Sequence, residues 1–283
     1  MLLKSYAKIN VSLKVNGRKE DGYHDIELVN LPIDLRDVIE IDLLPSNFID
    51  SYVTTDNPDL ASVPENLCQR ALNLMREKFK FKANFDIFIH KEIPFAAGLG
   101  GGSSNAAAVI LGINSLLNLK AKKEDLHEVA TAVGADVPYF LCPKPAILRG
   151  IGEKIETFKV KKKYECLIIK PEQGLSTHEV YEACDETERL PIDTAGVVAG
   201  LEKGDDKLIE ASMGNDLFPA AEKMCPEVGK ILRELKADGY PLSAMTGSGS
   251  TVFALSSNPK KDHEILKKYL SKGYTVRLCK VLA

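Results

Sequence analysis

The chain has 283 residues, of which 45% are hydrophobic and 27% charged, and its formal net charge is −3. These values are typical of a globular protein, and the length leaves room for about two domains and a sizeable core. The slightly acidic balance gives no support for nucleic acid or an anionic membrane as the main partner.

The six cysteines lie far apart and form no C-x-x-C pair. Cys166 and Cys279 stand in apolar, strand-like stretches, where a buried and reduced thiol is the usual state. Residues 1–6 are too short and too polar for a signal peptide, and no apolar run approaches the roughly 20 residues that a membrane helix needs. We therefore expect a soluble, cytoplasmic protein without a membrane partner.

Alternating residues predict a half-buried strand over residues 5–15. Lys8 and Asn10 share its polar face, which either is exposed to solvent or faces a ligand. A turn-like stretch follows, and Tyr23 and His24 stand at its end. Such an aromatic and imidazole pair is usually structural.

Further alternating and helical patterns predict a strand over 38–44, a helix over 65–79 and a strand over 85–90. The last strand leads into a glycine-rich stretch, with Ser103, Ser104 and Asn105 suited to capping the helix that we expect from residue 106.

A glycine-rich loop before a helix offers unpaired backbone N–H groups and the positive end of the helix dipole to an anion. Phosphate is the natural candidate. The stretch is not a Walker A loop, because Ser103 and not Lys follows Gly102, and it is not a clean G-x-G-x-x-G motif. Taken alone, it could also be a flexible turn between a strand and a helix.

Asp136 and Pro138 stand directly after a short helix that ends near Gly134. Because Pro138 suits the first turn of a new helix, Asp136 is either a helix N-cap or a functional carboxylate. Residues 146–152 predict a turn, and the apolar strand at 164–170 opens a second half of the chain.

The second half combines a loop running into a helix, a regular amphipathic helix, another glycine loop, and a closing strand, helix and strand. These predicted elements lie at residues 174–181, 228–235, 246–251, 252–255, 261–271 and 274–279.

The two glycine loops, at residues 94–108 and 246–251, together resemble the motifs of the GHMP kinase superfamily, which phosphorylates small molecules. Three further stretches resemble the branch that acts on a cytidylyl-methylerythritol. These stretches are Ala7-Lys8-Ile9-Asn10, Asp21-Gly22-Tyr23-His24 and Gly134-Ala135-Asp136-Val137-Pro138, and they occur in the family's order across nearly the whole chain.

The resemblance implies a mixed α/β (α+β) fold of two domains. An N-terminal domain like ribosomal protein S5 domain 2, with the ATP-binding glycine loop, would occupy residues 1–155, and a ferredoxin-like domain would occupy residues 156–283. The active site of the family lies in the cleft between the two domains.

The implied activity is ATP-dependent phosphorylation of the 2-hydroxyl of 4-diphosphocytidyl-2-C-methyl-D-erythritol in the non-mevalonate (MEP) isoprenoid pathway. Asp136 matches the family's catalytic acidic residue, which could orient the hydroxyl and accept its proton. Lys8 matches the catalytic lysine, which could hold Asp136 ionised and offset charge on the transferred group. Mg²⁺ accompanies ATP in such transfers, but no residue is identified as its ligand.

The resemblance also assigns binding residues. Substrate would be held by Asn10, by Tyr23, His24 and Tyr181 at the cytidine end with Thr177 nearby, and by Gly247 and Gly249 over the diphosphate. ATP would be bound by Asn66, Leu67 and Lys91 near adenine and ribose, and by Pro94, Phe95, Ala96, Ala97, Gly98, Leu99, Gly100, Gly101, Gly102, Ser103 and Ser104.

The alternatives are a mevalonate-type or homoserine-type kinase of the same superfamily, a non-catalytic nucleotide-binding regulator, and an RNA-binding protein. The stretch Gly22-Tyr23-His24, paired with Lys8 and Asp136, favours the cytidylyl substrate over mevalonate and homoserine. Intact Lys8 and Asp136 count against a regulator that only binds nucleotide, and the acidic balance disfavours RNA. We expect a monomer or a weak homodimer.

Overall fold

The computed structural model describes residues 1–20, 22–61 and 66–282, so Asp21 of the sequence motif lies outside the described residues. The chain forms two compact units. Unit 1 comprises Met1–Ala7, Leu35–Phe95 and Gly100–Pro143, and unit 2 comprises Lys8–Asp34, Ala96–Leu99 and Lys144–Ala283.

Two long strands, β1 (Leu2–Arg18) and β2 (His24–Leu43), contribute residues to both units. Neither unit is therefore one continuous piece of chain. The division into sequence domains at residues 1–155 and 156–283 stays a prediction.

The strands of unit 1 are the first part of β1, the second part of β2, β4 (Phe85–His90) and β3 (Tyr52–Thr55). β4 runs antiparallel to β2, with Ile39 opposite Ile89, and β3 runs parallel to β4. Both isoleucines are fully buried, as the alternating pattern of the predicted strands requires.

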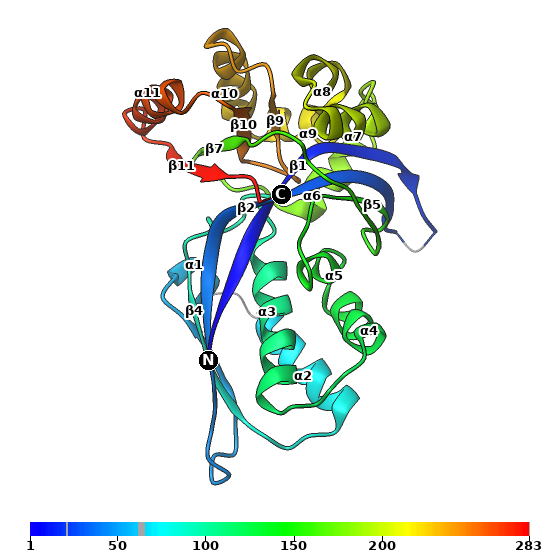
Figure 1. Cartoon of the computed structure of the whole chain (residues 1–283), viewed down its shortest axis with the longest axis vertical. Helices are drawn as coiled ribbons and strands as arrows, with labels where there is room; N and C mark the ends of the chain where they lie inside the picture. The colour runs from blue at the N-terminus through cyan, green and yellow to red at the C-terminus, as the bar shows by residue number, and fades with distance from the viewer. Residues whose placement is uncertain (21, 62–65, 283) are drawn as a thin grey trace. The chain divides into compact units, whose positions relative to one another are not determined.

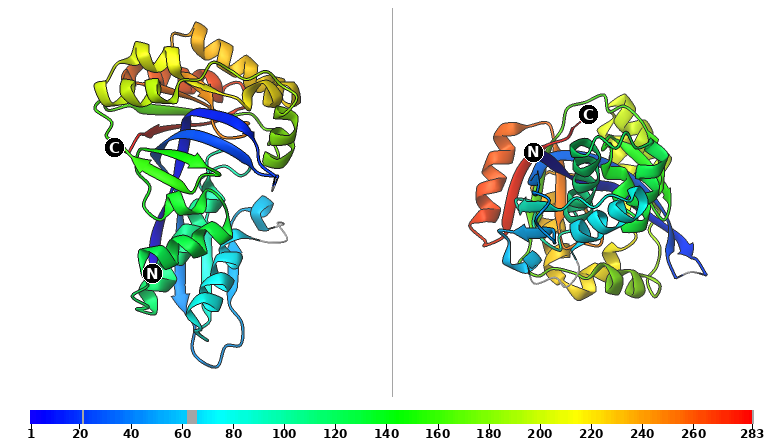
Figure 2. Two further views of the ribbon diagram at one scale, coloured as in Figure 1. Left: turned by 90° about the vertical axis from the view of Figure 1, so that its right-hand side faces the viewer. Right: turned by 90° about the horizontal axis from the view of Figure 1, so that it is seen from below.

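Helices α2 (Leu67–Phe79) and α3 (Gly101–Leu116) of unit 1 pack against each other, and Figures 1 and 2 show them side by side. A Cβ on Gly112 of α3 would meet the side chains of Leu3 and Ile41, so this glycine lets α3 approach the sheet closely. The unit also contains α1 (Pro58–Ala61), α4 (Lys123–Val133) and α5 (Val137–Phe140).

The start of α3 differs from the prediction. The helix begins at Gly101, five residues before the expected apolar run, and Gly100 is the N-cap with φ +72°. Ser104 and Asn105 therefore lie inside the helix and do not cap it. Their side chains both contact Ser5 Oγ, at 2.8 and 2.7 Å, and this tertiary contact replaces the local capping that their residue types suggest.

Unit 2 contains a four-stranded antiparallel sheet in the order β11 (Thr275–Lys280), β7 (Glu165–Lys170), β10 (Val252–Ser256), β9 (Ser243–Met245). Helices α10 (Pro226–Ala237) and α11 (Pro259–Leu270) pack on this sheet (Figure 1). The central strand β7 is buried from Cys166 to Lys170, which agrees with its continuous apolar sequence.

The predicted turn over residues 146–152 is wrong. Residues 146–150 form β5 (Ala146–Gly150), which pairs with β2 on one side and with β6 (Lys154–Thr157) on the other. Gly150 and Gly152 mark only the tight end of this hairpin, with φ +75° and +120°. The rest of unit 2 consists of α6 (Thr177–Cys184), α7 (Thr194–Lys203), α8 (Asp206–Ser212), β8 (Gly214–Asn215) and α9 (Phe218–Met224).

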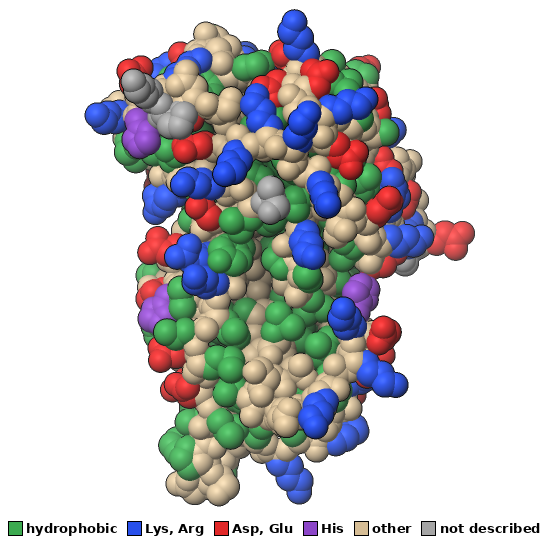
Figure 3. Space-filling model, viewed as in Figure 1, with side chains coloured by type: hydrophobic (Ala, Val, Ile, Leu, Met, Phe, Trp, Pro, Cys, Tyr) green, Lys and Arg blue, Asp and Glu red, His purple; other side chains and the backbone are tan. Residues whose placement is uncertain are grey.

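The surface carries both signs of charge. On the face drawn in Figure 3, Lys and Arg side chains are interspersed with Asp and Glu side chains. Among the described residues, no helix combines the length and the apolar character that a membrane span requires. The six cysteines are free thiols, of which Cys142 is exposed and the others, including Cys166 and Cys279, are buried.

Candidate functional site

The polar face of β1 is buried in unit 2, so of the two alternatives for this face, exposure to solvent is wrong. Lys8 is only 4% exposed and Asn10 only 2% exposed. Lys8 Nζ donates hydrogen bonds to Asn10 Oδ1 and to the carbonyl oxygen of Gly98, both at 2.7 Å. The first glycine loop therefore supplies a hydrogen-bond acceptor for the ammonium of the predicted catalytic lysine.

Asn10 connects several elements of unit 2. Its Oδ1 also accepts the backbone N–H of Gly247 at 2.8 Å, and its own backbone N–H donates to Thr246 Oγ1 at 3.0 Å. Its Nδ2 donates to Asn30 Oδ1 at 2.5 Å, which fixes the orientation of the Asn10 amide. The amide thus holds Lys8 and the second glycine loop at the same time.

Sequence reasoning missed Asn30, which is 1% exposed. The available signal was a single amide inside the otherwise apolar stretch 28–33. A buried polar side chain in such a stretch needs a partner, and here the partner is Asn10.

The two glycine loops approach each other backbone to backbone within unit 2. A Cβ on Gly98 would overlap the carbonyl oxygen of Thr246, and a Cβ on Gly247 would lie 2.8 Å from the carbonyl oxygen of Gly98. Both glycines have positive φ angles, +70° and +58°. Asn215 supports the second loop by donating to the carbonyl oxygens of Met245 and Gly247, each at 2.9 Å.

The N-terminus of α3 in unit 1 has the properties of an anion site. Its N-cap residue, Gly100, makes no side-chain cap hydrogen bond. Helix N-termini expose backbone N–H groups that lack an intrahelical partner, and the helix dipole favours negative charge there. Because Gly100 has no side chain and Ser104 is turned inward to Ser5, neither residue caps the first turn of this 16-residue helix.

Leu67 and Lys91, two of the predicted ATP-binding residues, lie beside this first turn. Leu67 Cδ1 is 3.6 Å and Lys91 Nζ 3.2 Å from the positions that a Cβ would take on Gly102 and Gly101. Asn66 precedes Leu67 and caps α2, because its Oδ1 accepts the backbone N–H of Cys68 at 2.9 Å.

Lys91 also has a charged partner that the sequence did not reveal. Asp37 is 0% exposed, and its Oδ2 lies 2.5 Å from Lys91 Nζ. The other carboxylate oxygen accepts the backbone N–H groups of Glu92 and Ile93 at 2.8 Å. Asp37 therefore fixes the segment that leads into the first glycine loop. Burial raises the pKa of the neighbouring Cys68 thiol to about 12.

Asp136 occupies the N-cap position of α5, but its side chain makes no cap hydrogen bond to the described residues. Pro138 stands in the first turn, as predicted. Burial and, second, the charge of Asp136 raise the pKa of the Tyr139 phenol. Since Asp136 belongs to unit 1 and Lys8 to unit 2, their pairing stays a prediction.

His24, Tyr181 and Thr177 come together in unit 2. The His24 ring is 5.0 Å from the Tyr181 ring, and its Nε2 is 2.8 Å from Asp185 Oδ1. Thr177 Oγ1 lies 2.9 Å from the hydroxyl oxygen of Ser248 in the second glycine loop. The substrate residues predicted around α6 therefore belong to one region.

Tyr23 precedes this cluster and is 59% exposed. Within the described part of the chain, no group of three or more His, Cys, Asp or Glu side chains is placed to hold a metal ion.

Comparison with known proteins identifies the family of the chain. Residues 66–144 match the GHMP kinases N terminal domain, and residues 197–275 match the GHMP kinases C terminal domain. A protein of Clostridioides difficile named 4-diphosphocytidyl-2-C-methyl-D-erythritol kinase is 38% identical over 275 residues, which are 96% of this chain and 92% of the relative. A Bacillus cereus protein of the same name is 37% identical and covers 98% and 96% of the two chains.

Solved structures confirm the predicted two-domain, mixed α/β fold. The crystal structure of a 4-(cytidine 5'-diphospho)-2C-methyl-D-erythritol kinase superposes with a TM-score of 0.82 at 27% identity and covers both chains completely. A homoserine kinase from Cytophaga hutchinsonii has a TM-score of 0.76 at 20% identity over 100% of this chain and 95% of its own, and it shows the fold alone. The chain belongs to the GHMP kinases and, within them, to the family of 4-diphosphocytidyl-2-C-methyl-D-erythritol kinases.

Proposed function

We propose that this protein uses ATP to phosphorylate the 2-hydroxyl of 4-diphosphocytidyl-2-C-methyl-D-erythritol, the substrate in its relatives' name, in the non-mevalonate isoprenoid pathway. The observation that carries the proposal is the buried Lys8, whose ammonium is bound by Asn10 and by the Gly98 carbonyl of the glycine loop. Relatives of this name at 36–38% identity over most of the chain support the choice of substrate.

Lys8 stabilises charge in this proposal. Two of its hydrogen bonds, to Asn10 Oδ1 and to the carbonyl oxygen of Gly98, fix the position of its ammonium. A preorganised ammonium in a buried site stabilises the charge that develops on a transferred phosphoryl group more strongly than one in water. Asn10 orients this ammonium.

Asp136 acts as the base that orients the substrate hydroxyl and accepts its proton. Its half-buried carboxylate is not used to cap α5, which supports this role. Proton transfer of this kind contributes about 10²- to 10⁴-fold to a rate.

ATP binds through the first glycine loop and the uncapped start of α3, with Leu67 and Lys91 beside it. Mg²⁺ arrives with the nucleotide, because this ion is usually held by one or two carboxylates together with substrate phosphates. Gly247 and Gly249 lie over the substrate diphosphate, and Tyr23, His24 and Tyr181 hold the cytosine, with Thr177 nearby. We further propose a cytoplasmic enzyme that is a monomer or a weak homodimer.

The test is ADP release from the purified protein with ATP and Mg²⁺ in the presence of the cytidylyl substrate, mevalonate, homoserine or no alcohol. The proposal predicts turnover with the cytidylyl substrate alone. Turnover with another alcohol would replace the substrate, and nucleotide binding without turnover on any of them would favour a regulatory protein.

A further inference from the structure

His24 is held by two residues that lie one helical turn apart. Tyr181 of α6 packs its ring against the imidazole at 5.0 Å with an interplanar angle of 34°. Asp185, four residues later, accepts from Nε2 at 2.8 Å. Residues at this spacing share one helix face, so the end of α6 fixes both the plane and one nitrogen of the ring.

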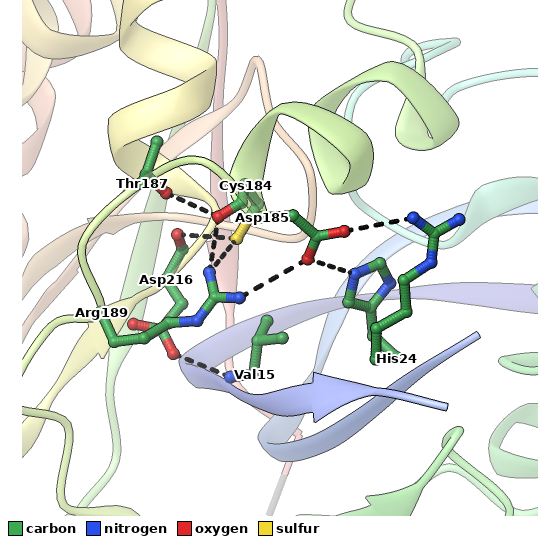
Figure 4. A network of polar contacts seen from close by, with 8 residues as sticks. Val15, His24, Cys184, Asp185, Thr187, Arg189 and Asp216 are labelled. Atoms are coloured by element: carbon green, nitrogen blue, oxygen red, sulfur yellow. Dashed lines mark hydrogen bonds and ion pairs between the residues drawn. The ribbon is translucent and has the colours of Figure 1, made fainter. Parts of the chain in front are cut away.

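Asp185 is itself oriented by two cations. The guanidinium of Arg189 lies 3.7 Å from its Oδ1 (Figure 4). The guanidinium of Arg18 lies 3.5 Å from its Oδ2. The Asp185 side chain is 28% exposed, whereas the His24 side chain is 7% exposed. The imidazole is therefore mostly buried, while its carboxylate partner is more exposed to solvent.

The end of α6 has little freedom, because Asp216 ties it to the rest of unit 2 (Figure 4). One carboxylate oxygen of Asp216 accepts the backbone N–H of Val15 at 2.8 Å, as drawn in Figure 4. The other accepts the backbone N–H of Leu190, also at 2.8 Å. Its backbone oxygen accepts from the Cys184 thiol at 3.3 Å, and Arg189 donates to the Cys184 carbonyl at 2.7 Å. Asp185 therefore presents its carboxylate from a fixed position.

A carboxylate can only accept hydrogen bonds, so its contact with Nε2 requires a proton on that nitrogen. In a neutral imidazole the other nitrogen, Nδ1, is then an acceptor. Cytosine presents an amino group, N4–H₂, at the position where uracil presents a carbonyl oxygen. An Nδ1 acceptor that meets this edge of the base would pair with the amino group of cytosine and would face a second acceptor when the base is uracil.

We propose that Asp185 is a positioning residue that makes the base site select cytosine over uracil, by fixing the proton of His24 on Nε2. The inference rests on the proposed function, in which His24 and Tyr181 hold the base. Leaving a buried acceptor unpaired costs enough to give a preference of about 10- to 100-fold for the cytosine nucleotide.

The test compares Asp185→Asn with the natural protein, with Glu186→Gln as the matched control. Glu186 is the exposed neighbour of Asp185, so its variant makes the same charge change without touching His24. Binding of CDP and of UDP is measured by calorimetry without ATP. The protonation of both His24 nitrogens is read from nitrogen chemical shifts at about pH 8, where an ordinary histidine is neutral. Asp185→Glu tests whether a carboxylate restores the effect.

We expect the natural protein and Glu186→Gln to prefer CDP and to carry the His24 proton on Nε2. In Asp185→Asn, an amide that can also donate to Nε2 allows the other tautomer, so the CDP preference should fall at least about fivefold, close to the loss of one neutral hydrogen bond. Asp185→Glu should recover part of it.

The inference is overturned if the CDP preference is unchanged in Asp185→Asn, if neither nucleotide binds, or if both His24 nitrogens carry protons in the natural protein. A CDP preference that depends on Asp185, in a protein that releases no ADP with any alcohol, would support the inference and contradict the kinase proposal. ADP release with the cytidylyl substrate, together with an unchanged CDP preference in Asp185→Asn, would support the kinase proposal and contradict the inference.

Discussion

Replacing Gly98 by Ala tests whether the close approach of the two glycine loops is required. At φ +70° a side chain is strained, and the added Cβ would overlap the Thr246 carbonyl oxygen and lie 3.1 Å from that of Gly249. The strained backbone and the overpacking together should cost about 2–5 kcal/mol. Because the obstacle is backbone and not a flexible side chain, little of this cost can be relieved by a rotamer change.

Gly273→Ala is the matched control. Its φ of +83° is similar, but no heavy atom of the described residues lies within 4 Å of the new Cβ. It should therefore show the backbone strain alone, about 1–2 kcal/mol. The assay is urea unfolding of both variants and of the natural protein, with the m-value checked for constancy.

The reasoning would be refuted if Gly98→Ala and Gly273→Ala lost the same free energy of unfolding within about 0.5 kcal/mol. Gly247→Ala removes the same close approach from the other loop. The double variant with Gly98→Ala should therefore lose less than the sum of the two single losses, because both changes separate the same two segments.

Three further predictions concern buried polar groups. Asp37→Asn leaves the Lys91 ammonium buried without its carboxylate and should cost about 3–5 kcal/mol in urea unfolding, and a second change, Lys91→Met, should recover much of this loss; no recovery would contradict the ion-pair account. Asn30→Ala leaves the Asn10 amide without its acceptor and should cost about 1–3 kcal/mol, with Asn30→Asp as the control that keeps an acceptor. The Cys68 thiol, with its pKa raised to about 12 from 9.0, stabilises the fold fully below pH 9. This contribution should decline by up to about 1.4 kcal/mol per pH unit between pH 9 and 12, and an equal decline in Cys68→Ala would argue against it.

The sequence predicted the elements whose local pattern and tertiary environment agree. The alternation of Ile87 and Ile89 in β4 and the apolar run around Ile168 in β7 describe strands that are buried as their patterns require. The pattern of β1 was misleading, because Lys8 and Asn10 are buried by partners distant in sequence. Only contacts such as those with Gly98 and Gly247 distinguish a buried polar face from a solvent-exposed one.

The same limit applies to the candidate site. The glycine loops were found because their composition is a local signal. Asn30 offered only the weak signal of a single amide in an apolar stretch, and Asp37 offered none. Asp37 is buried where the segment after β4 supplies its partners, the Lys91 ammonium and the backbone N–H groups of Glu92 and Ile93. The early start of α3 follows from the same cause, since Ser5 binds the side chains that would otherwise cap the helix.

The most direct measurement of the central claim is the steady-state rate of ADP formation by Asp136→Asn with ATP, Mg²⁺ and the cytidylyl substrate. The substitution keeps the shape of the side chain and removes the base. The account predicts a kcat lower by about 10²- to 10⁴-fold with both KM values little changed. A kcat within about threefold of the natural protein, far smaller than the contribution of a positioned base, would contradict it.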